Sequence, residues 1–156
     1  MKKTTRYLFI FLLCAVIVGV MLAFAPKPFA SHVSNLPDSS RVAIYCRATD
    51  LPATNMGNGY LVECRLAQFQ EIISHCHGVD GISARFAATQ DDFDQIIRHF
   101  QLTVTSAFQD CNLVALCGHS RQITGGVYVD GKLTNLQVAF DGATLTLGYP
   151  MILDSY

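Results

Sequence analysis

"VYVDGKLTNLQVAFDGATLTLGY", residues 127–149, decides the fold class of this chain. Two Asp-Gly pairs, at 130–131 and 141–142, separate runs in which polar and apolar residues alternate. Asp-Gly between alternating runs is the strongest short-range signal for a β-hairpin, because both residues tolerate the positive φ that a tight hairpin turn requires. The stretch therefore predicts an antiparallel meander.

Strand patterns continue towards the N-terminus. Short runs rich in β-branched and aromatic residues, separated by glycine, proline, aspartate or asparagine, predict further strands at 41–48, 59–64, 81–88, 102–108 and 113–119. No internal repeat and no low-complexity tract interrupts them.

Two helices are expected between these strands. The first begins at about Leu66 and ends at Gly78, with an apolar stripe at Leu66, Phe69, Ile72, Ile73 and Cys76. The second covers "QDDFDQIIRHF", 90–100, where Thr89 and Asp92 form a capping-box pattern. The predicted fold is therefore α+β: an antiparallel β-sheet with two helices packed on one face, preceded by an N-terminal membrane helix.

That membrane helix is predicted from residues 7–25, which carry no charge and follow Lys2, Lys3 and Arg6. As a helix, these residues would extend about 28 Å, close to the thickness of the hydrocarbon core of a bilayer. The alternatives are a cleaved signal peptide, which would leave a secreted protein, and a buried helix of a soluble protein. The basic residues at the start place the rest of the chain outside the cytoplasm.

The domain boundaries follow from this assignment. Residues 1–25 are the signal-anchor or signal peptide. Residues 26–40, rich in proline and serine, are expected to be a flexible tether. Residues 41–156 are expected to form a single α+β domain, long enough to bury one core.

Three stretches, "GVDGISARFAAT" (78–89), "DDFDQIIRHF" (91–100) and "LTLGYPMILDSY" (145–156), carry a resemblance to a known family. Together they resemble an uncharacterised, TATA-box-binding-protein-like family of extracytoplasmic proteins from spore-forming bacteria. The resemblance implies an antiparallel sheet with helices on one face, behind an N-terminal membrane segment. It implies no catalytic residues and no binding of DNA.

The charge distribution bears on partners. After residue 25 the chain has eight Lys/Arg and twelve Asp/Glu, a net charge of −4. The basic residues are scattered along the sequence, with no run or stripe among them. Nucleic acid and anionic lipid head groups are therefore not expected as ligands.

Six cysteines occur, of which Cys14 lies in the apolar N-terminal segment. An extracytoplasmic location permits disulfides among the other five. Cys46 and Cys64 lie on the first two predicted strands and form a candidate disulfide; Cys111 and Cys117 form a second. Buried, reduced cysteines are the competing interpretation.

Histidines beside cysteines raise the question of a metal site. Cys76 and His77, together with Cys117 and His119, form a candidate set of ligands. The spacing lacks the C-x₂₋₄-C and H-x₃₋₅-H pairs that structural zinc sites use. "HCHG", 75–78, is more typical of a helix end, with a histidine in the last turn and glycine just beyond it. No metal and no other cofactor is therefore predicted.

No catalytic motif of the nucleophile-elbow, zinc-protease or phosphate-loop type is present in the sequence. A polar strand face is a candidate binding surface for an envelope protein or polymer, and its residues are Asn135, Gln137, Thr144 and Thr146. We therefore expect a membrane-tethered, extracytoplasmic, non-catalytic binding domain that acts in a process of the bacterial cell envelope. A process related to sporulation is one such role. The alternatives are a secreted thiol or metal-binding protein using Cys76, Cys117 and His119, and a cell-wall hydrolase.

Overall fold

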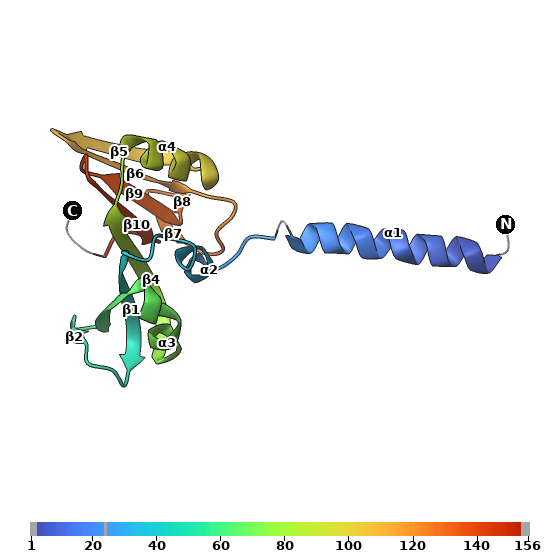
Figure 1. Ribbon diagram of the computed structural model, residues 1–156, viewed down its shortest axis with the longest axis horizontal. Helices are drawn as coiled ribbons and strands as arrows, with labels where there is room; N and C mark the ends of the chain where they lie inside the picture. Colours follow the sequence, from blue (N-terminus) through green and yellow to red (C-terminus); the bar gives the residue numbers. More distant parts are fainter. Residues whose placement is uncertain (1–2, 24, 154–156) are drawn as a thin grey trace.

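The computed structural model of the protein describes residues 3–23 and 25–153 (Figure 1). Its main feature is an eight-stranded sheet in the order β2-β3-β1-β4-β10-β9-β6-β5, in which every neighbouring pair is antiparallel. The strands are β1 (Arg41–Thr49), β2 (Thr54–Asn55), β3 (Tyr60–Arg65), β4 (Cys76–Ala87), β5 (Thr103–Asp110), β6 (Leu113–His119), β9 (Leu136–Phe140) and β10 (Thr144–Tyr149). A separate hairpin is made of β7 (Val127–Val129) and β8 (Lys132–Thr134). The predicted α+β class with an antiparallel sheet is confirmed.

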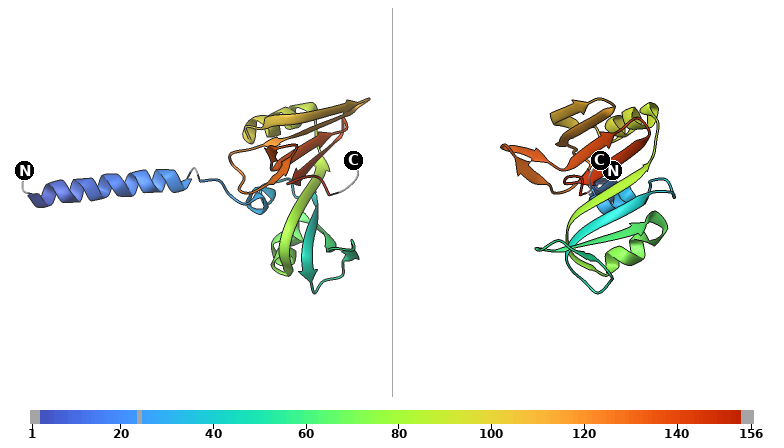
Figure 2. Two further views of the ribbon diagram at one scale, coloured as in Figure 1. Left: turned by 180° about the vertical axis from the view of Figure 1, so that it is seen from behind. Right: turned by 90° about the vertical axis from the view of Figure 1, so that its left-hand side faces the viewer.

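The helices are α1 (Lys3–Ala23), α2 (Phe29–Val33), α3 (Phe69–Ser74) and α4 (Gln90–His99), and a 3₁₀ turn, η1 (Leu66–Gln68), precedes α3. Apolar residues of α2, α3 and α4 belong to one hydrophobic core with alternate residues of the strands, such as Val42 and Ile44 of β1. We call the sheet face that carries this core the inner face. The opposite face, which carries Ala43 and Ser83, is the outer face. Figure 2 shows the twisted sheet from two further sides.

The helix α4 begins as predicted. The Thr89 hydroxyl accepts a hydrogen bond from the Asp92 backbone N–H (3.4 Å), and the Asp92 carboxylate accepts one from the Thr89 backbone N–H (2.8 Å). These two reciprocal bonds satisfy backbone donors that a helix start leaves open. Phe93 of α4 and Phe100, which directly follows the helix, are buried in the core.

The first predicted helix is shorter than expected. It ends at Ser74, and Cys76, His77 and Gly78 begin the long strand β4. These residues pair with the end of β1, where Thr49 faces Cys76, so the backbone hydrogen bonds of the sheet replace those of a further helical turn. Gly78 has the positive φ (+63°) that is common for a glycine just after a helix, but it lies inside the strand. The assignment of "HCHG" as a helix end is therefore wrong.

At the N-terminus, α1 projects away from the sheet (Figure 1), and its side chains from residue 11 to residue 22 are all exposed. Over the residues that the structure describes, no helix has the length and apolar character needed to cross a membrane. This result does not support the membrane helix predicted from the sequence.

Residues 26–40, expected to be a flexible tether, contain α2 and pack onto the sheet. Phe29 and Val33 are buried in the core, and the Phe29 ring stacks on Tyr149 with ring centres 5.8 Å apart. The Lys27 backbone also bonds to the loop before β7, through its N–H to the Gln122 carbonyl (2.8 Å). The chain is therefore held against the domain from Lys27 onward.

At the other end, the chain turns back after Tyr149 and crosses the outer face. The backbone N–H of Leu153 donates to Ser83 Oγ (2.7 Å), and that of Ile152 donates to Gln137 Oε1 (3.0 Å). Gly148 permits this approach, because a Cβ there would collide with the backbone of Met151 and Ile152. Residues 150–153 thus cover part of the outer face.

Candidate functional site

The candidate disulfide partners lie apart. The register of β1 and β3 pairs Cys64 with Val42, and it pairs Cys46 with Tyr60. Four residues along a strand correspond to roughly 13 Å, beyond the reach of a disulfide. Both cysteines are free thiols, and Cys46 instead has Cys76 as its neighbour on the inner face. Burial, followed by the Cys46 thiol beside it, raises the pKa of Cys76 to about 11.

The candidate metal ligands are also separated. Cys76 is buried on the inner face at the start of β4, while the neighbouring His77 is exposed. Cys117 and His119 lie on β6, three strands away, or roughly 14 Å across the sheet. Within residues 3–23 and 25–153, no group of three or more His, Cys, Asp or Glu side chains could hold a metal ion. The sheet therefore does not bring the four predicted ligands together.

The predicted polar binding face is mostly buried. The Asn135 side chain is enclosed and bonds to the backbone of Ser120 and Ile123. Gln137 lies under the returning C-terminal segment. Thr144 is half-buried, and Thr146 is buried beside Arg85 of β4. Of the four residues, only Thr146 lines a cavity on the outer face.

The strand register builds a feature that the sequence does not display. Arg65 on β3 pairs with Arg41 on β1, Arg41 pairs with Arg85 on β4, and Arg85 pairs with Thr146 on β10. We call the residues Arg65, Arg41 and Arg85 the arginine row. Side chains directly opposite each other on adjacent antiparallel strands have Cβ atoms about 4.5–5.5 Å apart. The three arginine side chains therefore leave the sheet side by side on its outer face.

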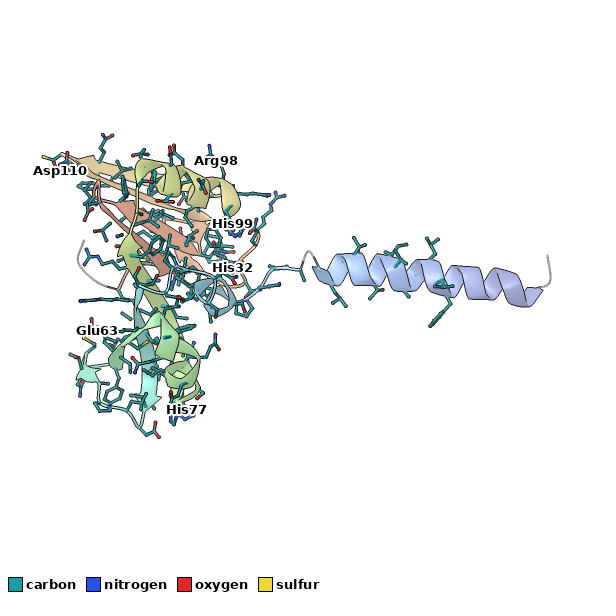
Figure 3. The ribbon with its side chains drawn as sticks, viewed as in Figure 1. His32, Glu63, His77, Arg98, His99 and Asp110 are labelled. Atoms are coloured by element: carbon teal, nitrogen blue, oxygen red, sulfur yellow. The ribbon has the colours of Figure 1, made fainter. Side chains whose placement is uncertain are left out.

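The arginine row lines an open cavity of about 510 Å³. Glu63, Ser83 and Thr146 add polar groups to its wall, and Ala43 adds an apolar patch. Glu63 lies on the side of the sheet away from α2 (Figure 3). All three arginines belong to regular strands of one sheet, so the spacing of the cavity wall is fixed by backbone hydrogen bonds.

The positive charge of the row is only partly balanced. Among the described residues, the ion pairs are Arg47–Asp80 and His75–Asp50, and neither includes the arginine row. Two carboxylates stand near the row: Glu63 in the cavity wall and Asp141, whose pKa is lowered mainly by the Ala143 and Thr144 backbone N–H groups and further by Arg85. Arg85 Nε is buried and has no hydrogen-bond partner among the described residues.

A second cavity, of about 620 Å³, lies on the helical side between α2 and α4. His32 and His99 meet there, with ring centres 6.5 Å apart, and both are labelled in Figure 3. Burial lowers the pKa of His32, partly offset by its hydrogen bond to the Gln122 carbonyl (3.3 Å). The His32 ring also packs edge-on against Phe100. The side chains around this cavity therefore mainly hold α2 against the domain.

Comparison with protein families, with curated proteins and with solved structures finds no match for this chain. The resemblance noted from the sequence therefore stays a prediction. The arginine-lined cavity is the candidate functional site on geometry alone.

Proposed function

We propose that the protein is a non-catalytic binding protein of the bacterial cell envelope and that it holds its partner on the outer face of the sheet. The single observation that supports this is the open cavity lined by the arginine row. Binding sites are typically concave and carry a few convergent polar groups on a rigid frame. The helices cover only the inner face, so a partner reaches the row without displacing them.

The location outside the cytoplasm rests on the sequence. Residues 7–25 carry no charge and follow three basic residues, which is typical of a segment that enters the secretory route. The envelope partner is a protein or polymer that meets the domain at the outer surface of the membrane. Membrane tethering through residues 7–25 is part of the same proposal.

Site-specific crosslinking in the source cells tests the binding function. A photoreactive residue at Glu63 stands in the cavity wall, and one at the exposed Arg121 serves as the control. We expect an envelope component to crosslink from position 63 and not from position 121. Equal crosslinking from both positions, or none from position 63, would contradict the proposal.

Two further measurements address location and catalysis. Protease added to intact cells with a permeabilised outer layer should digest residues 26–156 if the domain lies outside the membrane. Protection until the membrane is lysed would place the domain in the cytoplasm.

Release of soluble fragments from purified cell wall by the full chain would contradict a non-catalytic role.

A further inference from the structure

Building on the proposed binding function, we propose that the arginine row binds a phosphate group of the ligand. The guanidinium groups of Arg41, Arg65 and Arg85 supply the charge, and the hydroxyls of Ser83 and Thr146 supply neutral donors at the edge of the same cavity. The phosphate is a compact ester or diphosphate group carried by the envelope partner, rather than part of a long polyanion, because the domain that carries the site has a net charge of −4.

The first argument is the cost of placing the arginines together. Like charges directly opposite on neighbouring strands repel each other, and this row contains two such pairs, Arg65–Arg41 and Arg41–Arg85. Glu63 in the cavity wall and Asp141 near Arg85 balance two of the three charges. An anion that enters the cavity would neutralise the remaining positive charge and reduce the repulsion between the arginines.

The second argument is the orphaned donor at Arg85. Its Nε–H is buried and meets no acceptor among the described residues, whereas buried polar groups are normally hydrogen-bonded. Arg85 lines the same cavity as Ser83 and Thr146. A guanidinium donates two parallel hydrogen bonds to an oxyanion, and Nε–H takes part in that fork.

The third argument selects phosphate over carboxylate. Ser83 Oγ already accepts the Leu153 N–H, so its own hydroxyl hydrogen remains to donate. With Thr146 on the next strand, the cavity offers hydroxyl donors in addition to the guanidinium forks. A phosphate monoester carries a charge near −2 and three acceptor oxygens, while one carboxylate carries −1 and two oxygens. The donor set therefore fits a tetrahedral dianion better.

Calorimetric titration of the full chain, purified in a non-ionic detergent, tests the proposal. The probes are inorganic phosphate, pyrophosphate and, as a carboxylate of similar charge, citrate. We expect pyrophosphate to bind more tightly than citrate, with an affinity that falls as salt rises. Arg85→Gln and Arg65→Ala should each weaken pyrophosphate binding about tenfold or more, as expected for the loss of a charge-assisted hydrogen bond. Arg121→Ala, an exposed arginine outside the cavity, should leave it unchanged.

Arg65 is exposed, so Arg65→Ala keeps the test valid if Arg85→Gln unfolds. Absence of pyrophosphate binding, equal binding of citrate, or equal loss in Arg121→Ala would overturn the phosphate assignment. If the crosslink from position 63 persists in any of these cases, the binding function stands and only the ligand class is wrong. If the crosslink is also absent, the proposed function fails as well.

Discussion

Asn135 and Arg85 show two ways in which this sheet holds a polar group away from water. The Asn135 amide is fully used: its oxygen accepts the Ser120 N–H (2.7 Å), and its nitrogen donates to the carbonyls of Ser120 and Ile123 (both 2.9 Å). Arg85 Nε is buried without such a partner among the described residues. A satisfied buried group stabilises the fold, whereas an unsatisfied one points to a ligand.

Replacing Asn135 should therefore destabilise the domain strongly. Asn135→Ala removes the side-chain partners of the Ser120 N–H and the Ile123 carbonyl and leaves the Ser120 carbonyl only a long bond from the Ile123 N–H (3.5 Å), so we expect a loss of about 2–4 kcal/mol in the free energy of unfolding. Urea unfolding followed by circular dichroism measures it. Asn112→Ala, in the exposed turn between β5 and β6, is the matched control and should change stability by less than about 0.5 kcal/mol. Similar losses in both variants would refute the role given to Asn135.

The Cys76 thiol gives a second prediction at the scale of one residue. Its pKa of about 11 leaves a thiolate fraction near one in a thousand at pH 8, and its side chain is buried. We expect iodoacetamide to modify Cys76 at least about a hundredfold more slowly than the exposed Cys111 in the native protein. Peptide mass spectrometry after timed labelling measures both rates. Unfolding the protein in urea should bring the two rates together; a fast native reaction at Cys76 would contradict its burial.

The same raised pKa links Cys76 to stability at alkaline pH. An unfolded cysteine ionises near pH 8.5, but the folded protein keeps the thiol protonated up to about pH 11. The stability that this group contributes is present below about pH 8.5 and is lost as the pH rises towards 11. Cys76→Ala should therefore flatten the fall in melting temperature across this window, even if it lowers the melting temperature at pH 7. An unchanged slope would show that Cys76 is not the group that titrates.

At the scale of elements, sequence patterns predict those pieces that local chemistry determines. The hairpin turns at Asp130-Gly131 and Asp141-Gly142 and the capped start of α4 are where the sequence places them. The sequence does not predict the boundary between α3 and β4. The apolar stripe fits a helix up to Cys76, but it carries no information about the strand pairing with β1 that draws Cys76 into the sheet. The helix α2 was missed because five residues give too short a pattern.

The helix α2 carries a prediction about pH. Burial lowers the pKa of His32, His99 and Lys27 lower it further, and Asp92 and Arg98 also line the cavity beside it. The unfolded chain therefore takes up a proton near pH 6.5, above the pH at which the folded protein does. The contribution of His32 to the free energy of unfolding should be fully present above about pH 6.5. It should decrease as the pH falls below that value.

Urea midpoints between pH 7.5 and 5.0 measure this effect. His32→Gln keeps a donor for the Gln122 carbonyl but removes the titration, so its stability should depend less on pH than that of the natural chain. His77→Gln, at the exposed start of β4, is the matched control and should keep the natural slope. Identical slopes for His32→Gln and the natural chain would exclude His32 as the titrating group.

At the scale of the whole molecule, the order of the strands decides which residues become neighbours, and the sequence does not contain that order in any local pattern. Arg41, Arg65 and Arg85 look scattered because 24 and 20 positions separate them. They form a row only because β1 lies between β3 and β4 in a register that sets the three opposite one another. The same non-local pairing places Cys117 far from Cys76.

The arrangement of the whole chain also predicts which parts are needed for folding. The side chains of α1 from residue 11 to residue 22 are exposed, whereas Phe29 and Val33 of α2 are buried in the domain core. A chain of residues 26–156 should therefore unfold in one transition with the melting temperature of the full chain. A chain of residues 37–156 should lose at least about 3 kcal/mol of stability, because removing a buried phenylalanine alone costs about that much. Differential scanning calorimetry compares them, and a domain that is stable only with residues 1–25 attached would show that α1 takes part in the fold.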